Sequence, residues 1–70
     1  MSDVRVERFP GPHDLVGSYR RFGPVGPVYE VAGVLRELED GDTLMKVTMV
    51  ETGEELEYPF LSVLDDPKAD

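Results

Sequence analysis

Residues that could carry out catalysis are few, and the first to consider is a histidine beside an acid. His13 precedes Asp14, and it is the one histidine of the 70-residue chain. A Ser-His-Asp arrangement needs the base held against its nucleophile. The serines stand elsewhere, at Ser2, Ser18 and Ser62. We therefore interpret His13 as an exposed loop residue without a catalytic role.

Carboxylates are more numerous, but their spacing predicts neither a metal site nor an acid–base pair. Glu39, Asp40 and Asp42 surround one glycine, whereas a calcium loop distributes its acids over about a dozen residues. Glu55 and Glu57 alternate with apolar residues, so both are expected to face solvent in similar surroundings. General acid–base pairs need unlike surroundings. We predict no catalytic residue, no metal ligand and no cofactor, and hence a protein that is not an enzyme.

The stretch RRFGPVGPVYEV, residues 20–31, contains two glycines but does not predict a phosphate-binding loop. It lacks the Lys and Ser/Thr of a P-loop, and its prolines have no N–H to donate to a phosphate. Gly23 and Gly26 are free to adopt positive φ, whereas Pro24 and Pro27 hold φ near about −65°. We interpret the stretch as a stiff connection between two strands.

Charge is the strongest compositional signal. Fifteen Asp and Glu against seven Lys and Arg give a formal net charge of −8, and all of the excess acid lies after residue 36. Such a field repels nucleic acid and anionic lipid and favours a basic protein partner. The same acidity also fits a small domain that is merely kept in solution.

Targeting and membrane signals are missing from the sequence. The first residues lack the apolar run of a signal peptide, and no run of 18 apolar residues occurs. The chain has no cysteine, which fits a reducing compartment. These features predict a cytoplasmic protein that does not contact a membrane.

Two alternative functions concern nucleic acid. In the segment YRRF, Tyr19 and Phe22 flank Arg20 and Arg21, and small barrels present aromatic and basic residues of this kind to single strands. The excess of acids disfavours this nucleic-acid site, because phosphate contacts dominate affinity. In the opposite alternative, a rigid row of carboxylates imitates nucleic acid and blocks a basic groove. That row contains Glu37, Glu39, Asp40, Asp42, Glu51, Glu54, Glu55 and Glu57.

Alternating apolar residues predict four strands, at residues 15–22, 29–38, 43–50 and 55–59. A three-residue turn at Glu39–Gly41, with glycine in the left-handed conformation, sets Leu35 opposite Met45, Gly33 opposite Val47 and Val31 opposite Met49. A turn at Thr52-Gly53 sets Met49 opposite Leu56 and Val47 opposite Tyr58. Both registers place the same face of residues 43–50 inward.

The remaining residues predict a short helical turn and the domain limits. Phe60, Val63 and Leu64 share one helical face after Pro59, and Pro67 limits the helix. Together these elements predict a small all-β, SH3-like, partly open barrel with about four strands, a bend at Gly33 and a C-terminal helical turn. The domain covers residues 14–66, preceded by a flexible tail or short edge strand (1–13) and followed by a tail (67–70).

Four motifs carry a family resemblance: RRFGPVGPVYEV, LEDGD, VETGEELEY and LDDPKA. Together they resemble a family of short uncharacterised proteobacterial proteins, over residues 15–69. The resemblance implies bacterial origin and brings no activity or cofactor. This chain departs from the family pattern at two positions. Thr52 stands where many members have a serine before the turn glycine, and Thr43 stands where they have an aromatic residue after DGD. Both threonines fit the predicted turn and strand.

The function predicted from these features is a protein-interaction or regulatory module, with its oligomeric state open. A groove between the 22–28 loop and the EDGD turn, lined by aromatic residues, is predicted to hold another protein, and a basic partner fits the acidic face. The partner-binding residues are Arg20, Arg21, Phe22, Tyr29, Glu54, Glu55, Glu57 and Tyr58.

Overall fold

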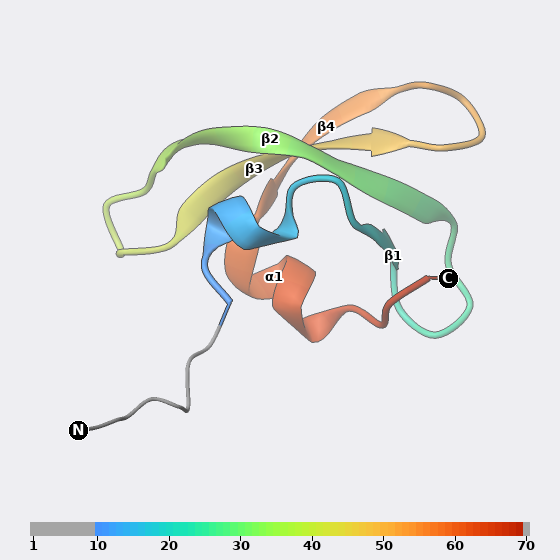
Figure 1. Cartoon of the computed structure of the whole chain (residues 1–70), viewed down its shortest axis with the longest axis horizontal. Helices are drawn as coiled ribbons and strands as arrows, with labels where there is room; N and C mark the ends of the chain where they lie inside the picture. Colours follow the sequence, from blue (N-terminus) through green and yellow to red (C-terminus); the bar gives the residue numbers. More distant parts are fainter. Residues whose placement is uncertain (1–9, 70) are drawn as a thin grey trace.

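The computed structural model describes residues 10–69, which form a curled antiparallel sheet with two short helices on one side (Figure 1). A 3₁₀ helix, η1 (Pro12–Leu15), leads into β1 (Tyr19–Arg21). The long β2 (Val28–Glu37), β3 (Thr43–Met49) and β4 (Glu55–Pro59) follow, and α1 (Phe60–Asp65) comes last. The strand order is β1-β2-β3-β4. This confirms the all-β class, the number of strands and the C-terminal helix.

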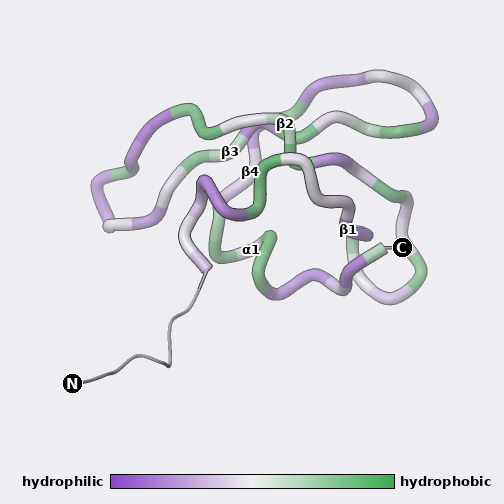
Figure 2. The backbone as a smooth tube through the Cα atoms, viewed as in Figure 1, coloured by the Kyte–Doolittle hydropathy of each residue, from purple (hydrophilic) through white to green (hydrophobic). Residues whose placement is uncertain are grey.

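The core lies between the inner face of the sheet and the two helices. Its buried residues are Leu15, Tyr29, Val31, Met45, Val47 and Val63. Phe60 and Leu64 are packed against this cluster, as the helical spacing predicts. Figure 2 shows hydrophobic colour along much of α1 and hydrophilic colour in the turn between β2 and β3. Burying one apolar face of each element is what holds this small sheet curled.

The first predicted strand is too long. Leu15 belongs to η1, and β1 contains only three residues. Gly17 lies between the two elements with φ of 94°, a conformation that interrupts an extended chain and suits glycine. The backbone of Gly17 and Ser18 still bonds to Val31, with N···O distances of 2.8 and 2.9 Å.

The turn between β2 and β3 has the predicted form. Leu38 N–H donates to the Asp42 carbonyl at 2.7 Å across a three-residue loop, and Gly41 has φ of 92°. Near this turn the predicted register holds, because Arg36 pairs with Leu44. Further along β2 it is wrong, since two β-bulges change the pairing.

Each bulge adds one residue to β2 and reverses the direction of the side chains that follow. Val47 pairs with Val31 instead of the predicted Gly33, and Met45 pairs with Val34 instead of the predicted Leu35. Leu35 consequently faces outward and is 43% exposed. A bulge bends a strand and increases its twist. The first bulge coincides with the predicted bend at Gly33.

The register between β3 and β4 differs from the prediction by two residues. Val47 pairs with Leu56 and Met45 with Tyr58, because the loop contains four residues rather than two. Met49 N–H donates to the Glu54 carbonyl at 2.7 Å, and Gly53 closes the turn with φ of 77°. A shift by two residues preserves which side chains face inward, so the predicted inner face is correct.

Residues at both predicted domain limits can be placed. Within the predicted N-terminal tail, residues 1–9 lie outside the described residues, and Pro12 and His13 belong to η1. Within the predicted C-terminal tail, Arg21 N–H donates to the Pro67 carbonyl and Ala69 N–H to the Tyr19 carbonyl, both at 3.0 Å. Residues 67–69 therefore lie along β1.

Candidate functional site

Three aromatic side chains from three different segments pack together beside the core. The ring centroids of Phe22 and Tyr29 are 4.3 Å apart, those of Phe22 and Tyr58 5.0 Å, and those of Tyr29 and Tyr58 5.6 Å. Tyr29 is fully buried, and Phe22 is packed against the core. The sequence grouped these three residues correctly, but their rings pack on one another instead of lining an open groove.

A carboxylate that the sequence analysis missed lies beside these rings. Asp66 Oδ2 accepts the hydroxyl of Tyr29 at 2.7 Å and that of Tyr58 at 3.0 Å. Its Oδ1 accepts the N–H of Gly23 at 3.4 Å. We call Asp66 with these two tyrosines the Asp66 clamp. It ties α1 to the first loop and to two strands.

The clamp holds both phenols in their protonated form. Burial, followed by the hydrogen bond to Asp66 and the charge of its carboxylate, raises the pKa of Tyr29 far above its ordinary value. The same causes, in the same order, raise the pKa of Tyr58. A phenol that stays neutral and donates its hydrogen bond to a carboxylate holds that carboxylate in position and does not act as a base.

Arg20 lies on the inner side of β1, where its guanidinium closes the end of α1. Nη1 donates to the carbonyl of Asp66 at 2.9 Å and to that of Val63 at 3.3 Å. Its Nε is buried with no hydrogen-bond partner among residues 10–69. A cation suits the carbonyl end of a helix. The side chain is 7% exposed, so Arg20 is structural here and not accessible to a partner.

The YRRF segment is divided by the alternation of β1. Tyr19 and Arg21 are exposed, whereas Arg20 and Phe22 point toward the core. Arg21 Nη1 donates to the Gly26 carbonyl at 3.4 Å. Successive side chains of a strand point to opposite faces, and the four residues therefore do not form one basic aromatic surface.

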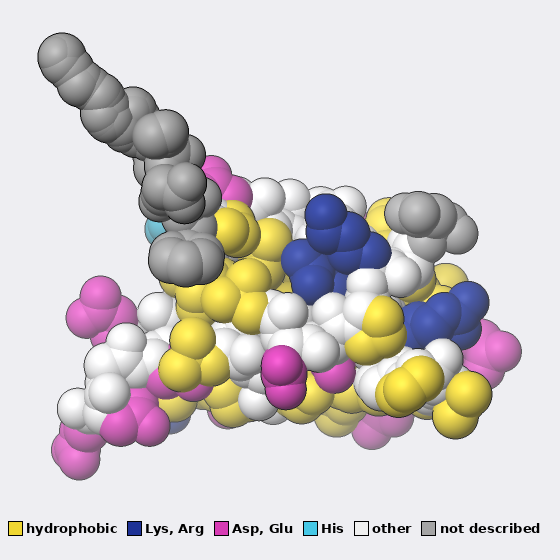
Figure 3. Space-filling view, turned by 90° about the horizontal axis from the view of Figure 1, so that it is seen from below, with side chains coloured by type: hydrophobic (Ala, Val, Ile, Leu, Met, Phe, Trp, Pro, Cys, Tyr) yellow, Lys and Arg dark blue, Asp and Glu magenta, His cyan; other side chains and the backbone are white. Residues whose placement is uncertain are grey.

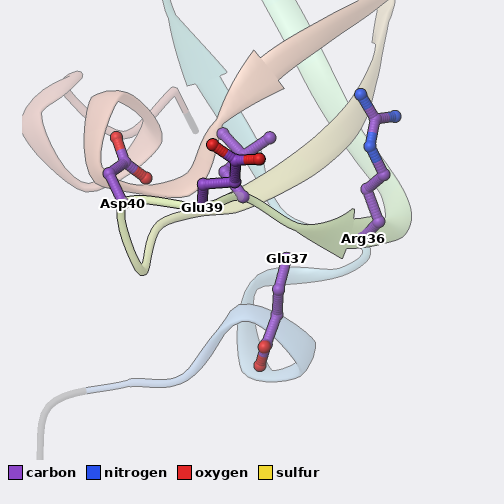
Figure 4. Close-up of a pocket in the computed structure, with 5 residues that line it drawn as sticks. Arg36, Glu37, Glu39 and Asp40 are labelled. Carbon is purple, nitrogen blue, oxygen red and sulfur yellow. The ribbon is translucent and has the colours of Figure 1, made fainter.

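The predicted groove between the 22–28 loop and the EDGD turn does not exist, because the two segments adjoin opposite ends of β2. Ten residues of strand separate them, a distance of roughly 30 Å. A depression does lie at the turn, lined by residues 36–40. Figure 4 shows that Glu37 points toward η1 and that Arg36 extends from the other side of the strand.

The acids of the β3–β4 hairpin are all exposed, in contrast to the Asp66 clamp, where Tyr29 is buried and Asp66 and Tyr58 are half-buried. We call this set the acidic hairpin, and it contains Glu51, Glu54, Glu55 and Glu57. Lys46 Nζ lies 3.5 Å from Glu55 Oε2 and offsets one of the four charges. Figure 3 shows a different face, seen from the side of η1 and α1, where apolar side chains predominate and the acids lie mainly toward the margins.

The exposed members of the predicted partner-binding set are therefore Arg21, Glu54, Glu55 and Glu57. Phe22 and Tyr58 are half-buried, and Arg20 and Tyr29 are buried. A buried side chain cannot contact a partner in this structure. The accessible candidate site is consequently the acidic hairpin, and the aromatic cluster supports the fold.

Comparison with known proteins gives a family. The family of unknown function DUF5397 matches residues 7–70, so the chain belongs to that family. An uncharacterized protein of Haemophilus influenzae is 37% identical over 54 residues, which are 77% of this chain and 86% of the relative. The family resemblance seen in the sequence is confirmed, and the relative is bacterial. In the described residues no helix is long and apolar enough to cross a membrane.

Proposed function

We propose that this protein is a non-enzymatic interaction module that binds a basic partner protein through the acidic hairpin. The observation that carries this proposal is the exposure of Glu51, Glu54, Glu55 and Glu57 on one hairpin. Exposed carboxylates of one sign steer a cationic partner and select against an anionic one. The proposed place of action is the cytoplasm, which fractionation of native cells tests.

Nucleic acid is the less well supported partner. Of the two arginines in YRRF, Arg20 already donates to carbonyls of α1, which leaves Arg21 as the exposed cation of that segment. One exposed arginine supplies few phosphate contacts. Titration with single-stranded and duplex oligonucleotides at low salt tests this alternative, and amide shifts at Tyr19 and Arg21 would support it.

The main proposal is tested with two variants of equal net charge. Glu55→Lys/Glu57→Lys changes the acidic hairpin. Glu37→Lys/Glu39→Lys makes the same charge change at the turn between β2 and β3, away from the acidic hairpin. A lysine-rich synthetic peptide serves as the probe, and fluorescence anisotropy at low salt measures its Kd. We expect binding to weaken about tenfold or more in the first variant only.

The control separates a local surface from overall charge. If both variants weaken binding equally, only the net charge attracts the peptide, and the acidic hairpin is not the site. Raising the ionic strength is expected to weaken binding of the unchanged protein, because exposed charges are screened. Binding that is insensitive to salt would contradict the proposal.

A further inference from the structure

The two edges of the sheet differ. At one edge, β1 is covered by the chain itself, because Pro67 and Ala69 bond to its backbone. At the other edge, β4 pairs with β3 on one side, and no other described residue bonds to its far side. An uncovered strand edge presents backbone N–H and C=O groups on which another strand can pair.

The backbone groups of β4 that are free can be assigned. Met49 N–H donates to the Glu54 carbonyl, and in an antiparallel pair the bonded positions alternate. Leu56 and Tyr58 therefore turn their backbone groups toward β3. Glu55 and Glu57 turn their N–H and C=O groups to the open edge, and Pro59, which has no N–H, ends the row of donors.

The side chains beside this edge indicate the chemistry of an added strand. Glu55 and Glu57 border a shallow depression of about 210 Å³, together with Leu35, Lys46 and Leu56. Leu35 lies there because the second bulge turns it outward. Carboxylates next to an exposed aliphatic side chain suit lysine or arginine, whose apolar stem packs while its charged end pairs.

We propose that a basic, extended segment of a partner protein adds to the β4 edge as an antiparallel strand. This inference rests on the proposed function and specifies its partner. Lysine or arginine at every second position faces Glu55 and Glu57, because residues opposite each other in a sheet share a face. A second copy of this chain fits less well at the edge, since its own Glu55 and Glu57 would meet like charges.

The backbone geometry makes a sharp distinction among peptide probes. In the antiparallel arrangement the residues opposite Glu55 and Glu57 are the basic ones, and their own N–H groups point at β4. The probe is an acetylated peptide of alternating lysine and valine. One isomer is N-methylated on the lysine amides and the other on the valine amides, so charge and mass are identical.

We expect methylation of the lysine amides to weaken binding about tenfold or more, because several backbone hydrogen bonds are lost. Methylation of the valine amides is expected to leave the Kd within about threefold, since these groups face away from β4. Anisotropy measures the Kd, and ¹⁵N spectra are expected to show the largest amide shifts at Glu55 and Glu57.

Each other outcome has a definite meaning. If only the valine isomer loses binding, the antiparallel arrangement is overturned. If all three peptides bind equally, strand addition is overturned, while the acidic hairpin remains a binding surface. If the unmodified peptide does not bind, or binds equally well to Glu55→Lys/Glu57→Lys, the proposed function fails as well.

Discussion

The hydroxyl oxygen of Tyr29 lies 2.7 Å from Oδ2 of Asp66, although 37 positions separate the two residues in the chain. The same carboxylate accepts a hydrogen bond from Tyr58, eight positions away. One side chain thus connects α1 with β2 and β4, and the stability of the barrel is expected to depend on it.

Replacing this carboxylate gives the first prediction. Asp66→Asn removes the charge and turns one acceptor into a donor, so the two phenols and the Gly23 N–H can no longer all be satisfied. We expect the free energy of unfolding to fall by about 1.5–3 kcal/mol, measured by urea denaturation. Asp65→Asn, at an exposed neighbour, is expected to change it by less than about 0.5 kcal/mol. Equal effects would show that the clamp does not stabilise the fold.

The raised phenol pKa values predict a loss of stability in alkali. In the folded state the pKa values of Tyr29 and Tyr58 lie above 10.0, the ordinary pKa of a tyrosine, so both residues bind their protons more tightly than in the unfolded chain. Below that pH both states are protonated and the stabilisation is complete. Above it the unfolded chain loses its protons first, so stability falls as pH rises.

Urea midpoints at about pH 8 and about pH 11 measure this dependence. Tyr58→Phe is expected to reduce the difference between the two midpoints, because one linked group is removed. Tyr19→Phe, at a side chain 45% exposed, serves as the control and is expected to keep the full difference. A dependence unchanged by Tyr58→Phe would contradict a linkage through this residue.

The two arginines of β1 are predicted to differ in importance. Arg20→Ala leaves the carbonyls of Val63 and Asp66 without their cationic donor and is expected to lower stability by about 2 kcal/mol or more. Arg21→Ala changes an exposed side chain, and its effect is expected to stay within about 0.5 kcal/mol. Thermal unfolding monitored by circular dichroism compares them, and similar melting temperatures would refute the structural role of Arg20.

Glycine is predicted to be essential at Gly26 for reasons of space. A Cβ there would overlap the carbonyl of Phe22, so Gly26→Ala is expected to lower stability by about 2 kcal/mol or more. A Cβ at Gly33 meets no atom within 4 Å. Gly33→Ala is therefore expected to be neutral or to stabilise by up to about 1 kcal/mol. Chemical denaturation of both variants tests the difference, and two effects of the same sign and size would disprove it.

The sequence predicts the parts of this structure that depend on local pattern. The turn at Gly41, the inner face of β3 and the helix after Pro59 all follow from neighbouring residues. The bulges of β2 do not, because they arise where the sheet curls around the core. Strict alternation therefore predicted, wrongly, that the Leu35 side chain faces the core.

The candidate site was predictable only in part. Glu55 and Glu57 are exposed as the alternation of β4 indicates, Glu54 is exposed in the turn before that strand, and Phe22, Tyr29 and Tyr58 do come together. The role of Asp66 depends on partners far along the chain, and it follows a short helix in a stretch that resembles an ordinary acidic surface. Two inward tyrosines that each need an acceptor were the one available signal, since buried hydroxyls seek partners.

The contacts of Arg20 with α1 have a consequence for the order of folding. They join residues 43 and 46 positions apart, whereas β2, β3 and β4 are linked by short turns. Closing a long loop has a larger entropic cost than closing a hairpin. The three-stranded meander can thus form early in the folding reaction. We therefore expect docking of β1 against the end of α1 to come late in folding and to be reversed early in unfolding.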